Sequence, residues 1–433
     1  MMRAQGDMRA GALARRALER SRKAWVRFSL FSWPRYALAG AGVVVTLAVV
    51  LSAIHAHGET LASTTASATS TAGARAEQRM AASPYGPLVS RGKPVSCSSN
   101  TSNAGGPNAI TSGKYGDWSF WQSDVGDLPA WCAIHIGAGA SRLMVVWSSD
   151  YVFDYIASDG MTPRDYTLSV SGDSSNGSDG HWQTVARVTG NETRVRESVI
   201  PFTGMSWVKM TVMSGQAQPS QPYIRIDQID CYDVSTNLND TALFSGDSIT
   251  AIAYSRFDGS QPTFDELMHQ ADPRLYPTML DEGLGGWSSD DAVQNIQTWL
   301  ELNPDIHYWL LGWGTNDALG MEDPGVFRAN MQRLIDLIKA AGHTPVLARI
   351  PATRQPGAGG EALNAEIRAL NAQIDALTTA NHLIPGPDLY TLINQHPDTY
   401  LSSDGVHPTA AGAIAMNRAW YQAMRAAFMA SAG

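Results

Sequence analysis

The feature that most constrains this chain is a change of hydrophobic pattern at about residue 240. Beyond it, short continuous apolar runs alternate with helical stretches such as residues 324–342, where Leu334 and Ile338 fall on one apolar face. Strands that are apolar throughout are buried on both faces, and strands that alternate with helices pair in parallel. The pattern predicts a doubly wound α/β domain over residues 240–433, with functional side chains at the carboxyl ends of its strands. The apolar runs are TALFSGDS, IHYWLLGWG, TPVLARIP and HLIPGPDLY.

The region before residue 240 has a different texture. Between residues 92 and 236, short apolar runs are separated by clusters of Gly, Asn, Asp and Ser, and none of the runs has helical period. This pattern predicts an all-β sandwich. The order of PAWCAIHIGAGASRLMVVW, DYTLSVSGDSSNGSDGHWQTV, WVKMTVMSG and IRIDQIDCYDV resembles the discoidin, or coagulation factor 5/8 type C, group of galactose-binding-like jelly rolls. The resemblance implies a jelly-roll, carbohydrate-binding-like module at 92–236.

Three tryptophans of this region are candidates for stacking on a sugar ring: Trp118, Trp121 and Trp182. A tryptophan in a sandwich more often belongs to the core, and this alternative applies to each of the three. No sugar-binding residue is therefore assigned from the sequence.

The N-terminal segment has the composition of a membrane anchor. Residues 1–35 hold nine Arg and Lys against two acids, and residues 36–54 carry no charge. As a helix, residues 36–54 would span about 28 Å, close to the hydrocarbon core of a bilayer. We expect a basic cytoplasmic segment at 1–35, a single-pass signal anchor at 36–54 and domains facing the periplasm or exterior. The alternative is a signal peptide cleaved near Ala56 and a secreted protein. Residues 55–91, rich in Ser, Thr and Ala, are expected to form a flexible linker.

The charge and the cysteine content indicate which partners and which cellular compartment the protein can have. The whole chain has a formal charge of -9, and because residues 1–35 carry +7 the remainder carries -16, which argues against a nucleic-acid partner. Three cysteines are consistent with an oxidising compartment. Cys97 and Cys231 bracket the β-rich region, so a disulfide joining its ends is expected, with Cys132 left as a small buried apolar residue. The other pairings remain open.

Polar stretches follow the apolar runs, and two of them supply a nucleophile and its base. Ser248 ends the tripeptide Gly-Asp-Ser after the first run, and Asp404 precedes His407 by three residues. A serine hydroxyl needs a base to take its proton, which His407 can provide. Asp404 can hold the other imidazole nitrogen and stabilise the imidazolium. Each has an ordinary alternative, since Ser248 can cap a helix and His407 can be a surface histidine.

Two further stretches supply donors for an oxyanion. The segment GLGG, residues 283–286, leads into a helix, and Asn316 directly follows the most apolar run. The amides of Ser248 and Gly286 and the Asn316 side chain make three donors, each worth about 3 to 4 kcal/mol of transition-state stabilisation. Each residue also has an ordinary structural alternative, since Gly286 can permit a tight turn and Asn316 can form an Asx turn. The catalytic interpretation is favoured because four stretches offer complementary roles, in order, at equivalent strand ends.

The stretches GDSI, GLGG, GTND and DGVH resemble the four blocks of the SGNH, or GDSL-type, hydrolase superfamily over residues 241–425. The resemblance implies a three-layer, flavodoxin-like α/β domain with a parallel sheet. It implies that Ser248 is the nucleophile and that Asp404 and His407 complete a catalytic triad. It also implies an oxyanion hole made by the amide of Ser248, Gly286 and Asn316.

The chain departs from the family pattern in its second block. Many members carry an Asn before the glycines, whereas this chain reads DEGLGG, which leaves Gly285 as an alternative donor to Gly286. The first block has Ile249 where the family has Leu, a minor change. The Gly-x-Ser-x-Gly elbow of ordinary α/β-hydrolases is absent.

These features predict an extracytoplasmic serine esterase, a carboxylic ester hydrolase acting through an acyl-serine. Pairing it with a sugar-binding-like module suggests acetyl esters of a carbohydrate as substrate, by analogy. One alternative is a polysaccharide O-acetyltransferase that uses the same acyl-serine. A lipase or thioesterase is disfavoured by the lack of an apolar lid. An alternative of another class is a non-catalytic glycan-binding protein.

No cofactor or metal is expected, because no His, Cys or Asp cluster has ligand spacing. A structural calcium, the acyl group and the oligomeric state stay open.

Overall fold

The computed structural model describes the chain from residue 86 to residue 431, apart from short segments. The expected basic segment, the membrane helix and most of the expected linker lie outside the described residues. None of the helices in the described part of the chain combines the length and apolar character that a membrane span requires. The described ranges are 86–99, 105–114, 119–149, 161–216, 223–236, 240–254 and 262–431.

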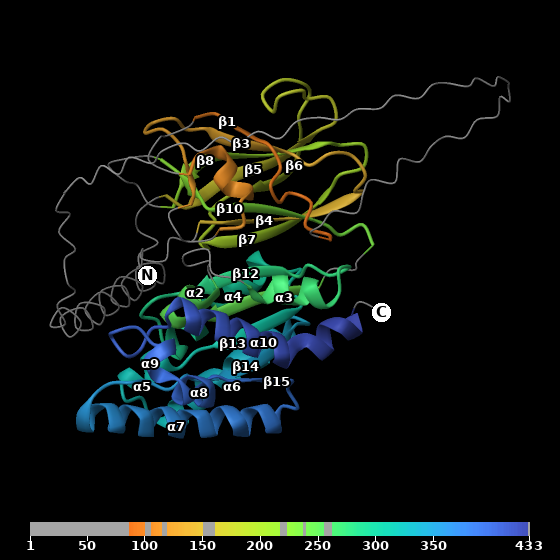
Figure 1. Ribbon diagram of the computed structural model, residues 1–433. Helices are drawn as coiled ribbons and strands as arrows, with labels where there is room; N and C mark the ends of the chain where they lie inside the picture. The colour runs from red at the N-terminus through yellow and green to blue at the C-terminus, as the bar shows by residue number, and fades with distance from the viewer. Residues whose placement is uncertain are drawn as a thin grey trace, which may run out of the picture. The chain divides into compact units, whose positions relative to one another are not determined.

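The described residues before 237 form a β-rich region of two main antiparallel sheets, coloured orange to yellow-green in Figure 1. The larger sheet has the order β1-β3-β8-β5-β6 and the smaller one β10-β4-β7. The predicted β-rich region is thus confirmed, whereas jelly-roll connectivity remains a prediction. The elements are β1 (Val95–Cys97), η1 (Pro107–Thr111), β2 (Trp121–Gln122), β3 (Ala130–His135), β4 (Arg142–Ser148), β5 (Pro163–Ser171), β6 (Gln183–Val188), β7 (Val195–Pro201), β8 (Trp207–Gly215), β9 (Arg225–Ile226) and β10 (Gln228–Asp233).

One apolar core lies between these two sheets. Successive residues of β4 point to opposite faces. Leu143, Val145 and Trp147 of β4 belong to the cluster between the sheets, together with Leu168 of the larger sheet. The Trp147 indole N–H donates to the Tyr166 hydroxyl over 2.9 Å, so this buried polar pair is satisfied.

The disulfide differs from the expected one. Cys97 of β1 and Cys132 of β3 are paired across the antiparallel strands, with Cα atoms 4.1 Å apart, and form a disulfide. The predicted bond between Cys97 and Cys231 is wrong because Cys231 lies on β10 of the other sheet, buried in the core as a free thiol. Burial raises the pKa of the Cys231 thiol far above its usual range.

The described residues from 240 onward form a parallel five-stranded sheet with the order β12-β11-β13-β14-β15. The predicted α/β domain with a parallel sheet is confirmed. Counted from its first strand, the order is 2-1-3-4-5, as in flavodoxin-like sheets, with a topological switch point between β11 and β13. The strands are β11 (Thr241–Gly246), β12 (Thr278–Gly283), β13 (Tyr308–Gly312), β14 (Thr344–Arg349) and β15 (Pro385–Asp388).

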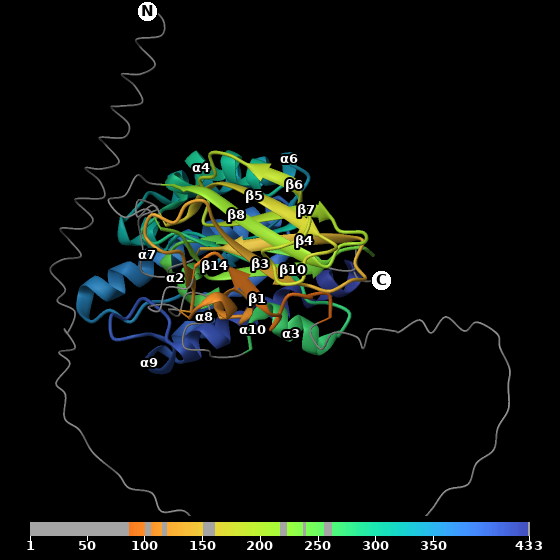
Figure 2. The same cartoon turned by 90° about the horizontal axis from the view of Figure 1, so that it is seen from above.

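Helices cover both faces of this sheet because its strands carry apolar side chains on both faces. Leu243 and Leu311 belong to a cluster with residues of α4, α6 and α7, whereas Phe244 and Leu310 belong to a cluster with residues of α2, α3 and α10. Figure 2 shows α4 and α6 on one side of β14 and α3 and α10 on the other. The helices are α2 (Ser248–Tyr254), α3 (Phe264–Ala271), α4 (Ser289–Leu302), α5 (Thr315–Leu319), α6 (Pro324–Ala340), α7 (Gly357–Ala380), α8 (Leu389–Gln395), α9 (Pro397–Tyr400) and α10 (Ala410–Ser431).

The smaller sheet of the sandwich is buried on both faces. Met144, Val146 and Tyr232 lie in the same apolar cluster as Leu243 and Leu280 of the parallel sheet. Strand β4 is buried along all but its first residue. The sandwich and the α/β region therefore share a hydrophobic core.

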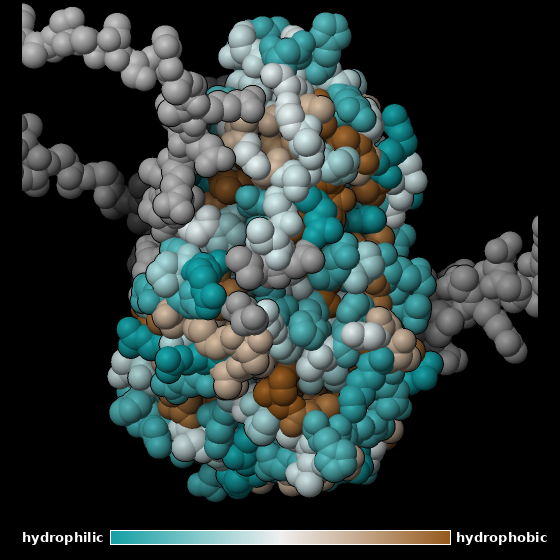
Figure 3. All heavy atoms as spheres, turned by 90° about the vertical axis from the view of Figure 1, so that its right-hand side faces the viewer, coloured by the Kyte–Doolittle hydropathy of each residue, from teal (hydrophilic) through white to brown (hydrophobic). Residues whose placement is uncertain are grey.

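The face of the molecule presented in Figure 3 is mainly hydrophilic. Figure 3 shows brown apolar side chains in small groups between hydrophilic ones on the face that it presents. The exposed large apolar residues in the described ranges are Val125, Met213, Met321 and Val326.

Candidate active site

Ser248 lies at the carboxyl end of the central strand β11, as the first residue of helix α2. The chain passes from strand to helix here over Gly246, where a Cβ would collide with Thr250 Oγ1 and the Gly312 carbonyl. Ser248 is 9% exposed. Its amide stands in the first helical turn, where N–H groups have no intrahelical acceptor, so it is available as an oxyanion donor.

His407 meets Ser248 from the loop between α9 and α10. Its Nε2 lies 2.9 Å from the Ser248 Oγ, and its Nδ1 lies 2.7 Å from Asp404 Oδ2. An ionised carboxylate can only accept, so Nδ1 carries the proton and Nε2 presents its lone pair to the serine hydroxyl. The three residues predicted as a triad are therefore in contact, in the arrangement that proton transfer from Ser248 requires.

Hydrogen bonds keep Asp404 ionised. Partial burial raises its pKa, but the His407 side chain, the amides of Val406 and His407 and the Ser402 hydroxyl together lower the pKa of Asp404 well below its usual range. The Val406 and His407 amides donate to Oδ1 over 2.8 and 3.0 Å, and the Ser402 hydroxyl does so over 2.7 Å. The carboxylate thus stays charged at neutral pH and can stabilise an imidazolium.

The second predicted stretch forms a tight turn after β12. The Trp287 amide donates to the Leu284 carbonyl over 3.2 Å, and Gly286, third in the turn, has a φ of 77°, which favours glycine. The Leu284 amide donates to the Gly246 carbonyl over 2.8 Å. This bond fixes the turn, with both Gly285 and Gly286 in it, to the end of β11.

Asn316 lies in the first turn of α5, directly after β13. Its side-chain Nδ2 donates to the Trp287 carbonyl over 2.8 Å, which joins the third predicted stretch to the second. A side-chain amide has two N–H groups, so one can hold the turn while the other serves an oxyanion.

Sequence reasoning assigns no role to two buried acids beside these residues. Burial raises the pKa of Asp247 to about 6, although hydrogen bonds from the Ile249 amide and the Thr315 side chain oppose the shift. Burial also raises the pKa of Asp317, which accepts from the amide and hydroxyl of Ser289 at the start of α4. An acid that follows an apolar strand is the signal that could have identified both. They tie the strand ends to the neighbouring helices.

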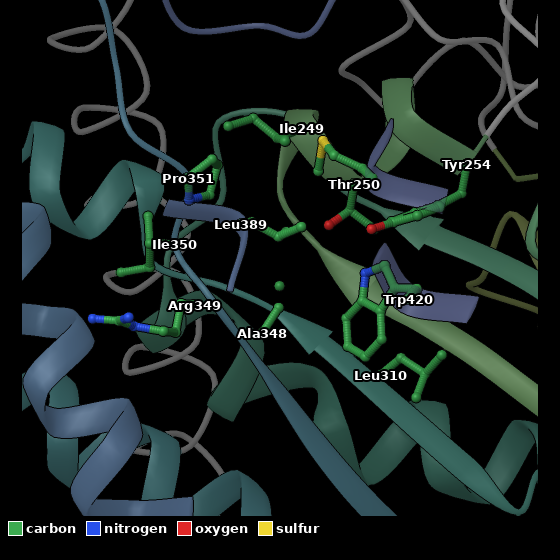
Figure 4. Close-up of a pocket in the computed structure, with 12 residues that line it drawn as sticks. Ile249, Thr250, Tyr254, Leu310, Ala348, Arg349, Ile350, Pro351, Leu389 and Trp420 are labelled. Carbon is green, nitrogen blue, oxygen red and sulfur yellow. The ribbon is translucent and has the colours of Figure 1, made fainter. Parts of the chain in front are cut away.

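A narrow cavity of about 10 Å³ lies behind helix α2, and Figure 4 shows Ile249, Tyr254 and Trp420 around it. Its lining includes none of the three triad residues, so it is distinct from the predicted site. It has room for about one water molecule, which makes it a gap in packing and not a substrate pocket. Within the described ranges, no group of three or more His, Cys, Asp and Glu could hold a metal ion.

The tryptophans of the sandwich differ in exposure. Trp121 is fully buried, and its indole N–H donates to the Ser99 carbonyl over 2.9 Å, so the core interpretation is right for it. Trp182 is partly exposed, with Lys209 Nζ 3.6 Å from its ring centroid. Trp118 lies outside the described residues.

Residues 244–414 match the sequence model of the GDSL-like Lipase/Acylhydrolase family, and the match lies within the α/β region. No match to the chain was found among curated proteins.

Several solved structures are similar to part of the chain. A lipase/acylhydrolase from Enterococcus faecalis is 20% identical, with a TM-score of 0.37, over 43% of this chain and 96% of that one. A variant of an acetyl xylan esterase from Geobacillus stearothermophilus is 18% identical, with a TM-score of 0.36, over 43% of this chain and 94% of that one.

Proposed function

We propose, from the match of residues 244–414 to the GDSL-like acylhydrolase family and from the contacts of Ser248, His407 and Asp404, that this protein is a serine esterase. The observation that carries the proposal is the hydrogen-bonded series from serine to histidine to aspartate. It gives a hydroxyl a base, and it gives that base an orienting carboxylate. An inert scaffold in a binding protein would not need these side chains in contact.

In the proposed mechanism, Ser248 Oγ attacks the carbonyl carbon of an ester while His407 Nε2 takes its proton. The amides of Ser248 and Gly286 and the Asn316 side chain stabilise the oxyanion. Collapse of the tetrahedral intermediate breaks the ester C–O bond, and His407 returns the proton to the leaving alcohol. Water then attacks the acyl carbon while His407 takes its proton, and His407 returns this proton to Ser248 Oγ as the acyl C–Oγ bond breaks and the acid is released. Asp404 stays ionised throughout and holds the imidazole tautomer.

The proposed substrate is an acetyl ester of a carbohydrate. Support comes from the pairing of a serine esterase with a sandwich that resembles sugar-binding modules, in which Trp182 is partly exposed. Transfer of the acetyl group to a sugar hydroxyl uses the same acyl-serine and is the alternative outcome.

The proposed location is outside the cytoplasm, with residues 36–54 as the membrane anchor. Support comes from the basic residues that precede this uncharged stretch and from the Cys97–Cys132 disulfide, since disulfides persist in oxidising compartments. Protease added to spheroplasts should cleave the protein, which should stay with the membranes after alkaline carbonate washing. Recovery from the culture medium would support a cleaved signal peptide instead.

Turnover by the full-length protein tests the function. It should release p-nitrophenol from p-nitrophenyl acetate and acetate from acetylated polysaccharides, and a fluorophosphonate should label Ser248. Ser248→Ala should abolish both turnover and labelling, while Ser431→Ala, at an exposed serine of α10, should change neither. Product analysis with a sugar acceptor separates hydrolysis from transfer. Glycan binding without turnover of any ester would favour a non-catalytic protein.

A further inference from the structure

A side chain of the sandwich reaches the turn that contains Gly286. Arg194 directly precedes strand β7 and is 8% exposed. Its guanidinium Nη2 donates to the carbonyl of Gly283, the last residue of β12 and 89 positions further along the chain. The donor therefore comes from a region that contains none of the predicted catalytic residues.

The peptide between Gly283 and Leu284 is held on both sides. Its carbonyl accepts from Arg194, and its N–H donates to the Gly246 carbonyl over 2.8 Å. Gly283 has no room for a side chain, because a Cβ there would collide with the backbone of Ala251 in helix α2. Hydrogen bonds from a charged donor are roughly twice as strong as neutral ones. Arg194 and the end of β11 thus set the orientation of this peptide together.

That orientation determines where the turn places its donors. The Leu284 carbonyl accepts from the Trp287 amide over 3.2 Å, and the Trp287 carbonyl accepts from Asn316 over 2.8 Å. A rotation of the peptide between Gly283 and Leu284 would therefore shift both the Gly286 amide and the Asn316 side chain. A misplacement of about 1 Å in a catalytic arrangement can lower the rate about 100-fold.

Arg194 is itself fixed in place. Its carbonyl accepts from the Ser149 amide of the sandwich over 2.8 Å. The next residue, Val195, lies in the core that the sandwich shares with the α/β region. Two positions later, Glu197 accepts from the Asp305 amide over 3.0 Å. The start of β7 is therefore anchored to both regions.

We propose that Arg194 is a positioning residue for ester hydrolysis, which orients the oxyanion-binding turn from the sandwich. The inference rests on the proposed function and gives the sandwich a part in catalysis that is separate from sugar binding. Arg194 acts through the Gly283 carbonyl and does not touch the reacting atoms. Its removal should therefore weaken transition-state stabilisation and leave substrate binding nearly unchanged.

Arg194→Met, which removes the guanidinium and keeps an apolar stem, tests this role in the full-length protein. The matched control is Arg142→Met, which removes an arginine donor to the Val234 carbonyl within the sandwich, a bond of 3.0 Å. Rates on p-nitrophenyl acetate are measured well below each melting temperature and expressed per active site, counted by fluorophosphonate titration. We expect kcat of Arg194→Met to fall about 10- to 100-fold at nearly constant KM. Its affinity for a boronic acid that forms a tetrahedral adduct on Ser248 should fall by a similar factor. Arg142→Met should match the wild type.

Arg194→Lys keeps the charge with a shorter reach and a single donor nitrogen, so its kcat and boronic acid affinity should lie between those of Arg194→Met and the wild type. If Arg194→Met does not fold, the Lys variant decides. The proposed role would be overturned if the Arg194 variants that fold keep the wild-type kcat and boronic acid affinity. It would also be overturned if Arg142→Met loses as much kcat as Arg194→Met, or if only KM changes. The proposed function fails in a different way, if the wild type hydrolyses no ester or if turnover survives Ser248→Ala.

Discussion

Replacing Asp404 with Asn perturbs the proposed triad at its orienting carboxylate. Asp404 Oδ2 accepts the His407 Nδ1–H over 2.7 Å, while Oδ1 accepts from Ser402, Val406 and the His407 amide. Asparagine has one acceptor oxygen, and three donors converge on the Oδ1 position. We expect the Asn oxygen to remain there and its NH₂ group to face His407. The imidazole must then carry its proton on Nε2, which leaves Ser248 without a base.

The expected loss is large. The wrong tautomer and the missing charge beside the imidazolium should lower the acylation rate about a thousandfold, or about 4 kcal/mol of activation free energy. The assay is the stopped-flow burst of p-nitrophenol from p-nitrophenyl acetate. His407→Ala should lower the rate further because it removes the base itself.

Asp398→Asn is the matched control for Asp404→Asn. Asp398 is an exposed acid of the neighbouring helix α9 and accepts from Arg354 over 2.7 Å, so its variant should acylate at the wild-type rate. An unchanged acylation rate in Asp404→Asn would refute the triad and leave a dyad, with another group orienting His407.

Three further predictions concern stability and the site. Burial raises the pKa of Glu197 to about 7, above its ordinary value of 4.5, so the unfolding free energy should fall as pH rises between these values. In urea denaturation, the unfolding free energy of Glu197→Gln should equal that of the wild type at pH 4 and exceed it by about 2 to 3 kcal/mol at pH 8. Equal unfolding free energies at both pH values would contradict this prediction. Gly283→Ala should impair turnover and lower the melting temperature, because its Cβ would collide with helix α2, whereas Gly359→Ala, with open space at Cβ, should not. Cys97→Ser should lower the unfolding free energy by about 3 to 4 kcal/mol, given a sequence separation of 35 between the bonded cysteines, and a reductant should destabilise the wild type but not this variant.

Hydrophobic periodicity was enough to predict the α/β region. The stretch 324–342, predicted as helical, contains helix α6, and the run IHYWLLGWG contains strand β13. Both signals are local, since a strand buried on two faces needs a continuous apolar run and a surface helix needs an apolar stripe. The β-rich character of the first region could be predicted in the same way.

The candidate site could be predicted as a set of residues but not as a geometry. Ser248 and Asn316 stand where polar stretches follow predicted strands, and parallel strands bring such stretches to one edge of a sheet. His407 instead reaches Ser248 from the loop between α9 and α10. The distance of 2.9 Å between Ser248 Oγ and His407 Nε2, and the four hydrogen bonds that lower the pKa of Asp404, depend on loop conformations that periodicity does not describe. The burial of Asp247, which raises its pKa, likewise depends on packing against neighbouring elements.

The amino-acid sequence by itself determined the order of the elements, the layers and the residues that line the strand ends, because these follow from which side chains avoid water over short spans. Tertiary structure alone decided that Cys97 bonds to Cys132, since that pairing depends on the register of β1 against β3. It alone brought Arg194 to the Gly283 carbonyl, 89 positions away. Contacts between distant segments depend on how sheets pack and on strand register, and a pattern read along one segment contains neither.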